Sequence, residues 1–311
     1  MKKILITGGT GFVGSNFVHE LLEAGGDMHL IVRPESNFWR INDIKDKLKL
    51  HYVDLLDAAE MEKFIAELEP EVILHFATYG AYQSRQQDIK LMIDTNLLGT
   101  INLVNAASKT KFDCFINTGS SSEYGEKDHP MKETDILEPN NLYGVTKAAA
   151  TMYAQFMAKK MNLPMATIRL FSPYGYFEEE GRLMPNVVKA GVNNEKFKAP
   201  SPLIMRDFLF IEDVLGAYLK AIDNINNIKG SVINVSSGEQ HSIADVVNAV
   251  EKKLGRKIDV EYGNFAVKQH EPKMWVADIS KAKKLLDWSP INSLTDGLSK
   301  FMAWAKNNPI G

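Results

Sequence analysis

The chain has 311 residues, of which 45% are hydrophobic and 24% are charged, and its formal net charge is −3. This composition is typical of a globular protein of one large domain or two, and the charge gives no general attraction to nucleic acid or to an anionic membrane. The single cysteine, Cys114, excludes an intramolecular disulfide and fits a reducing compartment. The apolar run after Met1-Lys2-Lys3 is too short for a secretion signal, and no segment has the length of a membrane span. We therefore expect a cytoplasmic protein that binds neither nucleic acid nor a membrane.

Strand-like and helix-like stretches alternate through the first half of the chain. Short apolar runs predict strands at Lys3–Thr7, Met28–Val32, Lys49–Val53, Val72–Phe76, Phe112–Thr118 and Met165–Phe171. Apolar residues at helical spacing predict helices at Phe12–Ala24, Ala59–Leu68, Ile89–Lys109 and Asn141–Met161. This alternation predicts an α/β fold, a Rossmann-type doubly wound parallel sheet with helices on both faces. Ligands of such sheets bind beyond the carboxyl ends of the strands.

The pattern loosens after Phe171. The stretch Tyr174–Ser201 is rich in Gly, Pro, Asn and Glu, with one helical pattern near Leu183–Ala190. Ile204–Phe210 predicts a strand that returns to the sheet, and further elements are predicted at Ile211–Asp223 (helix), Val232–Val235 (strand), Ile243–Leu254, Ile279–Leu286 and Leu294–Lys306 (helices). We therefore expect a sheet domain over residues 1–172, to which residues 204–235 return, and a smaller C-terminal cap formed by residues 173–203 and 236–311.

A glycine-rich turn, Thr7-Gly8-Gly9-Thr10-Gly11-Phe12-Val13-Gly14, joins the first predicted strand to the first predicted helix. In this context Gly8 allows a tight turn, Gly11 lets the backbone approach a pyrophosphate, and Gly14 lets the helix pack on the strand. The free amides and the dipole at the amino end of the helix favour an anion. The turn therefore predicts a dinucleotide site.

Arg33 ends the second predicted strand, where NAD sites usually carry Asp or Glu to bind the ribose 2′-hydroxyl. An arginine at this point suits a 2′-phosphate, so the sequence favours NADP (NADPH) and makes NAD the lesser alternative. A solvated loop arginine would give the same pattern.

Tyr143 and Lys147 lie four residues apart on a predicted helix and so share a face. A free tyrosine has a pKa of about 10, and a neighbouring ammonium favours the phenolate, which would let Tyr143 exchange a proton with a carbonyl or carbinol oxygen. A surface tyrosine beside a solvated lysine is the alternative for an isolated pair. The upstream glycine turn favours the catalytic interpretation.

Two further polar positions carry weaker signals. Ser120 opens Ser120-Ser121-Ser122-Glu123-Tyr124-Gly125 after a predicted strand, where a hydroxyl can orient the reacting oxygen; a serine-rich loop with local turns is the alternative. Asn96 lies inside a predicted helix although asparagine is a modest helix former. A buried amide there would hold a bent helix or a proton-relay water, and a satisfied structural asparagine is the alternative.

Arg206 precedes Asp207-Phe208, and both Arg206 and Arg182 can clamp a phosphate through the rigid guanidinium fork. Pairing of either arginine with a carboxylate such as Asp207 is the alternative. No His or Cys cluster has the spacing of metal ligands, so we expect no metal.

Together these motifs resemble the extended short-chain dehydrogenase/reductase family, the NAD(P)-dependent sugar-nucleotide epimerases, dehydratases and reductases. The similarity extends along nearly the whole chain. It includes Thr7–Gly14, Asp54-Leu55 (adenine contact), His75-Phe76-Ala77, Asn96, Arg169–Gly175, Arg206-Asp207-Phe208 before Ile211–Val214, and Asp278–Ala282 before Leu285–Pro290.

The resemblance implies a role for each matched position. Catalytic roles fall to Ser120, Tyr143, Lys147 and Asn96. Cofactor contacts fall to Gly8, Thr10, Gly11, Phe12, Val13, Gly14, Arg33, Asp54, Leu55, Phe76, Ala77, Thr78, Thr118, Tyr143, Lys147, Phe171 and Pro173. Substrate contacts fall to Ser120, Ser121, Ser122, Tyr143, Ser172, Arg182 and Arg206. The sheet domain then becomes an NADP-binding domain and the cap becomes the substrate-binding part.

Differences between this chain and the family pattern reduce the number of reactions to consider. Ser121 and Ser122 stand where 4,6-dehydratases carry Asp-Glu, and the fucose-forming epimerase-reductases carry a Cys at the place of Ser122. With Arg33, the chain is most similar to CDP-abequose or CDP-paratose synthase-type 4-ketoreductases. We expect reduction at C4 of a nucleotide-linked 4-keto-6-deoxy sugar, with Tyr143 protonating O4. An NAD-dependent UDP-glucose 4-epimerase and a non-catalytic NADP sensor are the alternatives.

The resemblance also implies a homodimer through a four-helix bundle, to which Leu97, Leu98, Ile101, Met152, Tyr153, Phe156 and Met157 would contribute.

Overall fold

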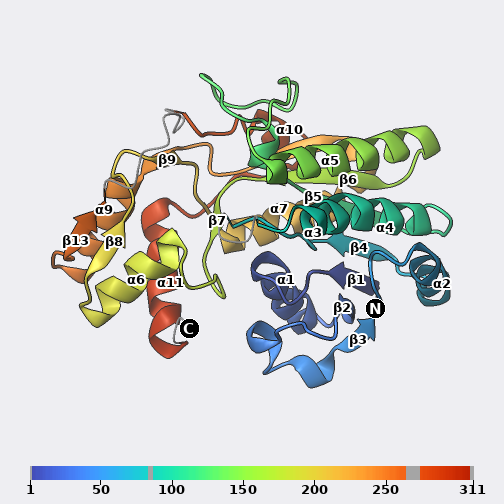
Figure 1. The fold of residues 1–311 in the computed structure, drawn as a ribbon, viewed down its shortest axis with the longest axis horizontal. Coiled ribbons are helices and arrows are strands. Elements are labelled where there is room, and N and C mark those ends of the chain that lie inside the picture. The colour runs from blue at the N-terminus through green and yellow to red at the C-terminus, as the bar shows by residue number, and fades with distance from the viewer. Residues whose placement is uncertain (1, 83–86, 264–273, 309–311) are drawn as a thin grey trace.

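The computed structural model describes residues 2–82, 87–263 and 274–308 (Figure 1). Within these residues the largest sheet has seven parallel strands in the order β11-β6-β5-β4-β1-β2-β3. Its strands are β1 (Lys3–Thr7), β2 (Asp27–Val32), β3 (Lys49–Tyr52), β4 (Val72–His75), β5 (Cys114–Ser120), β6 (Met165–Leu170) and β11 (Val232–Val235). The Rossmann-type doubly wound fold is confirmed. The strand order reverses between β1 and β4, which is where such sheets place their ligands.

Helices cover both faces of this sheet because successive strand residues point to opposite sides. Ile4 and Ile6 of β1 pack against the face covered by α1 (Phe12–Glu23) and α7 (Ile211–Asp223). Leu5, between them, packs into the cluster beneath the helices of the other face, which are α2 (Ala58–Leu68), α4 (Gly99–Ala107) and α5 (Leu142–Met161). Both faces of the strand are therefore buried, which explains the continuous apolar run in the sequence.

A second group of elements lies beside the sheet, on the left of Figure 1. It contains α6 (Leu183–Asn193), α9 (Ile243–Leu254) and α11 (Leu294–Asn307), which pack against one another. Three two-stranded pairs accompany them, β7 (Pro173–Tyr174) with β10 (Leu209–Phe210), β9 (Met205–Arg206) with β12 (His241–Ser242), and β8 (Phe197–Ala199) with β13 (Val260–Tyr262). Two short helices, α8 (Ile225–Ile228) and α10 (Ser280–Leu286), pack near β6 and β11 of the main sheet.

The single strand predicted over Ile204–Phe210 is wrong. The segment forms the short strands β9 and β10, and neither joins the main sheet. Asp207 separates them because its buried carboxylate accepts backbone N–H groups of Ser237, Gly238 and Ala277, which turns the chain at this point. β11 does return to the sheet, beside β6. The proposed division into a domain and a cap stays a prediction.

The helix predicted over Ile89–Lys109 is interrupted. It consists of α3 (Ile89–Ile93), a π-helical turn at Asp94–Leu98, and α4. Asn96 lies in the π-helical turn with its side chain fully buried. A π-helical turn inside an α-helix often accompanies a functional site, and this one faces the loop that follows β4.

Candidate active site

A cleft of about 800 Å³ opens at the carboxyl ends of the main strands and extends to the second group of elements. Most of the residues that the sequence singled out line it. Of the residues predicted to contact the cofactor, those that line the cleft are Gly8, Thr10, Gly11, Phe12, Val13, Gly14, Arg33, Asp54, Leu55, Phe76, Ala77, Thr78, Thr118, Tyr143 and Pro173. Of those predicted to contact the substrate, Ser120, Ser121, Ser122, Tyr143, Ser172, Arg182 and Arg206 line it. Lys147, Asn96 and Phe171 do not line the cleft and are almost completely buried.

The glycine turn has the geometry of an anion cradle. Gly8 has a φ of +72°, and a Cβ there would lie 2.6 Å from the backbone nitrogen of Ala77. A Cβ on Gly14 would lie 2.3 Å from the carbonyl oxygen of Gly8, so only glycine lets α1 start this close to the strand. No side chain caps α1 at Gly11, which leaves first-turn N–H groups for a ligand. A dinucleotide pyrophosphate fits this turn.

The end of β2 differs from the sequence-based expectation in one respect. Arg33 lies on the cleft wall, but its Nε forms an ion pair of 3.2 Å with Oε1 of Glu35, which lines the same wall. Arg33 is the residue that follows β2, and a carboxylate, that of Glu35, lies two residues further along the loop. The wall presents both a group suited to a 2′-phosphate and a group suited to a 2′-hydroxyl.

The loop after β5 is held by one buried carboxylate. Glu123 closes the 3₁₀ turn Ser121–Glu123, and its Oε1 accepts the backbone N–H of Ser120 at 2.8 Å and the hydroxyl of Thr151 at 2.9 Å. Its Oε2 accepts Nε of Arg169 at 2.7 Å, with both side chains buried. A Cβ on Gly119 would lie 2.5 Å from this carboxylate, which explains the glycine. Glu123 is thus a structural partner of Ser120 and is not available as the acid or base of a dehydration.

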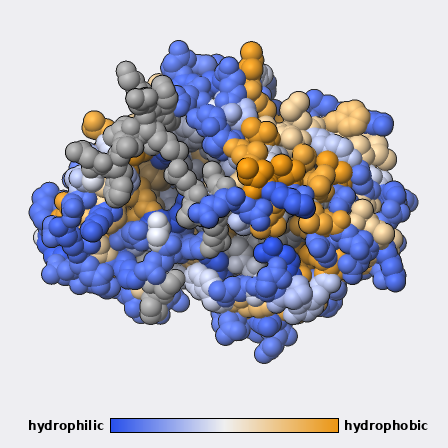
Figure 2. Space-filling model, in the orientation of Figure 1, coloured by the Kyte–Doolittle hydropathy of each residue, from blue (hydrophilic) through white to orange (hydrophobic). Residues whose placement is uncertain are grey.

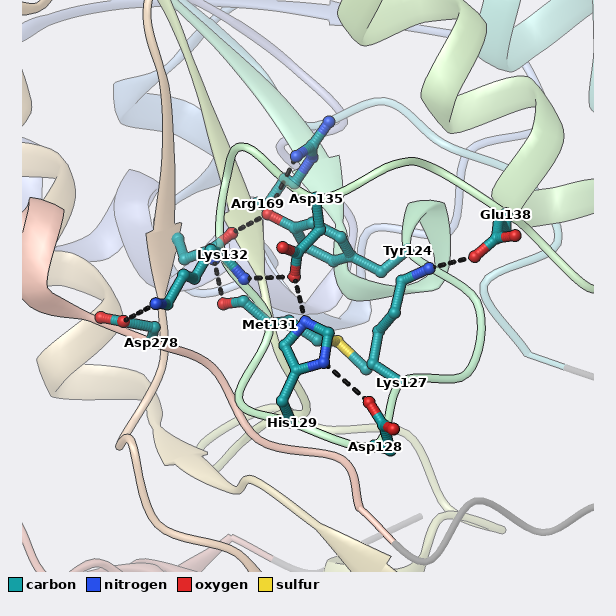
Figure 3. A network of polar contacts seen from close by, with 11 residues as sticks. Tyr124, Lys127, Asp128, His129, Met131, Lys132, Asp135, Glu138, Arg169 and Asp278 are labelled. Carbon is teal, nitrogen blue, oxygen red and sulfur yellow. Dashed lines mark hydrogen bonds and ion pairs between the residues drawn. The ribbon is translucent and has the colours of Figure 1, made fainter.

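The same network continues behind Ser120 into the loop over residues 124–138 (Figure 3). The Tyr124 hydroxyl accepts from Arg169 at 2.9 Å and donates to Oδ1 of Asn234 at 2.7 Å. Asn234 in turn donates to the carbonyl of Met131, whose backbone pairs with the segment ending at Asp278. Figure 3 shows this loop held between the sheet and the C-terminal segment, so the wall behind Ser120 is preorganised.

Helix α5 brings Tyr143 next to Ser120. Asn141 caps the helix by accepting the N–H of Gly144 at 2.8 Å, which places Tyr143 in the first turn. A Cβ on Gly144 would lie 2.3 Å from the carbonyl oxygen of Ser122, so the glycine allows the helix to approach the Ser120 loop. Hydrogen bonding with Ser120 and with Thr78 links the phenol to both neighbouring loops.

The electrostatics of Tyr143 and Lys147 reflect burial. Burial raises the pKa of Tyr143 above its ordinary value, and the hydrogen bonds with Ser120 and Thr78 lower it in part. Burial lowers the pKa of Lys147 to about 8, while the negative charge of Glu123 acts in the opposite direction.

Asn96 connects the π-helical turn to its surroundings. Its Oδ1 accepts the N–H of Tyr79 at 2.8 Å and the hydroxyl of Thr78 at 3.1 Å. Its Nδ2 donates to the Tyr79 carbonyl at 2.9 Å and to Thr146 at 3.0 Å. All four hydrogen-bonding positions of the amide are occupied, which agrees with the alternative of a structural asparagine that holds a distorted helix. Asn96 is also linked to Tyr143, because Thr78, which donates to Asn96, also interacts with the phenol.

The two predicted phosphate arginines lie on different parts of the wall. Nε of Arg182 pairs with Oε1 of Glu178 at 3.3 Å, and its guanidinium stacks over the ring of Tyr82 at 4.5 Å. Burial raises the pKa of Glu178 to about 7, and its Oε2 has no hydrogen-bond partner among the described residues. Arg206 stacks 5.5 Å from the ring of Trp275.

Several cleft residues were missed in the sequence. The polar and aromatic ones are Glu35, Ser36, Arg40, Tyr79, Tyr82, Thr95, Asn140, Asn141, Glu179 and Trp275. They belong to none of the motifs that the sequence showed, and only the closeness of Glu35 to Arg33 gave a local signal. Among the described residues, no group of three or more His, Cys, Asp or Glu side chains is arranged to hold a metal ion. No helix in the described ranges is both long and apolar enough to cross a membrane.

Comparison with known proteins agrees with this geometry. The model of the NAD dependent epimerase/dehydratase family matches residues 4–236. The chain belongs to this family. The resemblance seen in the sequence is confirmed, and the chain is an NAD(P)-dependent enzyme of the extended short-chain dehydrogenase/reductase type.

Relatives in the epimerase/dehydratase family match the chain from end to end. The UDP-glucose 4-epimerase of Lactobacillus helveticus is 24% identical, and the alignment covers 99% of this chain and 98% of the relative. The crystal structure of UDP-glucuronic acid 4-epimerase from Bacillus cereus, in complex with UDP-glucuronic acid and NAD, superposes with a TM-score of 0.86 at 28% identity and covers 98% and 99% of the two chains. The dTDP-glucose 4,6-dehydratase of Bacillus anthracis, in complex with NAD, gives a TM-score of 0.86 at 25% identity and covers 99% and 97%.

Proposed function

We propose that the chain is a nucleotide-sugar 4-epimerase in which Tyr143 moves the proton of the sugar O4. The carrying observation is that Ser120 and Tyr143 line the same cleft as the glycine turn, while Ser121 and Ser122 stand where a dehydratase needs acids. The full-length similarity to UDP-glucose and UDP-glucuronate 4-epimerases supports this choice. The 4-ketoreductase expected from the sequence has no support among these relatives beyond the family itself.

Each residue of the site has a separate role in the proposed reaction. The glycine turn and the amino end of α1 would hold the pyrophosphate of NAD, which when bound supplies hydride acceptor and donor chemistry at C4. Tyr143 takes the proton from O4 as the carbonyl forms and returns it after the sugar has turned its other face. Ser120 donates a hydrogen bond to the same oxygen. Lys147, with a pKa of about 8, keeps a positive charge beneath the site near neutral pH.

The distinguishing experiment follows product and cofactor together. Purified protein is incubated with UDP-glucose and, separately, with UDP-glucuronic acid, and the sugars are separated by chromatography while absorbance at 340 nm is recorded. We expect the 4-epimer to appear with no net change in the reduced dinucleotide, and NAD to be released when the protein is denatured. Stoichiometric oxidation of NADPH with a nucleotide 4-keto-6-deoxy sugar, without epimerisation, would contradict the proposal.

NADPH-dependent reduction of a nucleotide-linked 4-keto-6-deoxy sugar is the second candidate, and Arg33 favours it. An epimerase returns the hydride it takes and gains nothing by exchanging its cofactor, whereas a reductase must exchange it at every turnover. An arginine fork at the end of β2 suits the 2′-phosphate of NADPH. The paired Glu35 suits the 2′-hydroxyl of NAD.

The two cofactors are separated by two substitutions at this wall. If Arg33 binds a 2′-phosphate, Arg33→Ala raises the dissociation constant of NADPH about tenfold or more and changes that of NADH little, since each charged hydrogen bond contributes roughly 1.5–3 kcal/mol. Glu35→Ala should lower the dissociation constant of NADPH, because it removes the carboxylate that competes with the 2′-phosphate for Arg33. Titration of protein fluorescence with each nucleotide measures both constants. Equal responses of NADPH and NADH to Arg33→Ala would refute the assigned contact.

We also propose a homodimer formed through α3, the π-helical turn and α5. Figure 2 shows a hydrophobic area over these elements, and its exposed members are Ile89, Leu98, Val145, Met152 and Phe156. Tyr153 and Met157, which the sequence suggested for the same surface, pack partly against the core. An exposed apolar area of this kind on a globular protein marks an interaction site.

The oligomeric state tests this surface. We expect a dimer by light scattering at micromolar concentration, and a monomer when Met152 and Phe156 are both changed to Glu, because two carboxylates would be buried against their copies. Ile291→Glu is the matched control, since Ile291 is equally apolar and 84% exposed but lies elsewhere. A wild-type monomer would exclude the proposed interface.

A further inference from the structure

The two walls of the cleft are joined by side chains that have no place in the mechanism above. Arg40, in the 3₁₀ turn Trp39–Ile41, is 8% exposed, and its Nε donates to the carbonyl of Phe177 at 2.7 Å. Another nitrogen of the same guanidinium donates to the carbonyl of Thr10, in the glycine turn, at 3.3 Å. From α1, Nδ2 of Asn16 donates to the carbonyl of Tyr176 at 2.8 Å. Arg40 and Asn16 thus hold two successive carbonyls of the segment that leads to Glu179 and Arg182 on the other side of the cleft.

The segment they hold has an unusual backbone. Phe177 is a non-glycine residue with a φ of +62°, a conformation that costs of order 1–3 kcal/mol and persists only where its surroundings fix it. Its ring stacks on His19 of α1, with centroids 4.8 Å apart and planes 5° from parallel, and meets Trp304 edge-on at 5.1 Å. His19 in turn contacts the carbonyl of Arg40 at 2.9 Å. The path of the chain at Phe177 therefore depends on α1 and Arg40.

That path sets the position of the groups that follow. Glu179 and Arg182 line the cleft, and Arg182 is oriented by Glu178 on one side and by the ring of Tyr82 on the other. Tyr143 lines the same cleft as Arg182, whose charge lowers the pKa of the phenol in part. Arg40 and Phe177 thus lie between the glycine turn and the segment that carries Arg182.

We propose that Arg40 is a positioning residue that couples the binding of the dinucleotide to the binding of the nucleotide sugar. The inference rests on the proposed function only in placing these two ligands on the two walls. Arg40 joins Thr10 to Phe177. Whichever ligand binds first therefore orders both sides of the cleft, and the second ligand binds to a site that is already ordered. Such coupling is reciprocal, because each ligand must change the affinity of the other by the same factor.

Calorimetric titration tests this without any turnover. The measurements use protein from which bound dinucleotide has been removed. The dissociation constant of NAD (or of NADP, whichever binds) is measured with and without saturating UDP, and that of UDP with and without the dinucleotide; CDP, GDP and dTDP replace UDP if UDP does not bind. We expect each ligand to tighten the other by at least ~5-fold in the wild-type protein. Arg40→Lys keeps the charge but cannot span both carbonyls, and should bring this factor close to one. Arg256→Lys is the matched control, because Arg256 also donates to a backbone carbonyl, that of Gly191, but lies outside the cleft.

A second variant keeps the test decisive if Arg40→Lys does not fold. Asn16→Ser shortens the other side chain between the walls and should also reduce the factor. The inference is overturned if folded Arg40→Lys or Asn16→Ser retains the full factor, if the wild-type factor is one, or if no nucleoside diphosphate binds. Coupling that is present in a protein unable to epimerise any sugar contradicts only the proposed reaction. Epimerisation without coupling contradicts only the role of Arg40.

Discussion

Replacing Tyr143 with phenylalanine is expected to lower kcat by ~10²–10⁴-fold, the usual contribution of a positioned acid or base. In the proposed mechanism the phenol exchanges a proton with O4 and the glycine turn, which lines the same cleft, holds the dinucleotide. The dissociation constant of the cofactor should therefore change by less than about twofold. Initial rates of epimer formation measure the first quantity, and calorimetric binding of NAD to protein from which bound dinucleotide has been removed measures the second.

Tyr262→Phe provides the matched control for this substitution, since Tyr262 is an exposed tyrosine of β13 that does not line the cleft. It should leave both kcat and the melting temperature unchanged. Turnover by Tyr143→Phe at the wild-type rate would remove Tyr143 from the mechanism, and loss of cofactor binding would show that its ring supports the site in another way.

Acid should destabilise the protein through His75. This side chain is fully buried between the hydroxyls of Thr7 at 2.6 Å and Thr100 at 2.9 Å, and burial lowers its pKa to about 3. The unfolded chain takes up the proton near pH 6.5 and the folded chain does not, so unfolding binds one more proton between these values. The stabilisation is complete above pH 6.5. Below that pH the free energy of unfolding falls by about 1.4 kcal/mol per pH unit from this residue alone.

Urea unfolding at pH 7.0, 6.0 and 5.0 measures this dependence. In the His75→Gln variant this position cannot take up a proton. The free energy of unfolding of the variant should be lower at pH 7.0 than that of the wild-type protein, but it should fall less steeply with pH, by the slope that the uptake of one proton contributes. Burial also lowers the pKa values of His29 and His51, but both proteins contain them and their effect cancels in the comparison. Parallel pH dependences of the two proteins would mean that His75 titrates normally.

The sequence predicted the main sheet well because its strands are buried on both faces and leave continuous apolar runs. The bounds of α7 and α9 were predicted as the structure has them, since each combines a clear apolar face with a sharp start. The strand over Ile204–Phe210 was wrong because its course is decided by Asp207, whose partners lie 30 to 70 residues further along the chain. No local pattern carries that information.

In the candidate site, too, residues in local motifs were predicted and residues that act through distant contacts were missed. Gly8, Gly14, Ser120 and Tyr143 stand in motifs whose spacing is local, and the structure brings them to one cleft. Arg40 was missed because its partners, the carbonyls of Thr10 and Phe177, lie 30 and 137 residues away in the chain. Asn96 lies between these cases, because its weak helix propensity suggested a buried amide and the structure shows one within a π-helical turn.

The apolar core continues beyond the part of the chain that matches the family model. Ile4 and Phe17 of the sheet domain belong to the same cluster of buried side chains as Val246 in α9 and Phe301 in α11. A fragment ending near residue 236 would therefore leave part of its own core facing water, and the last 75 residues alone would have no sheet to cover them. Heating or denaturant should thus melt the two parts in one cooperative transition, and the end of the recognisable family segment is not a place where this protein can be cut.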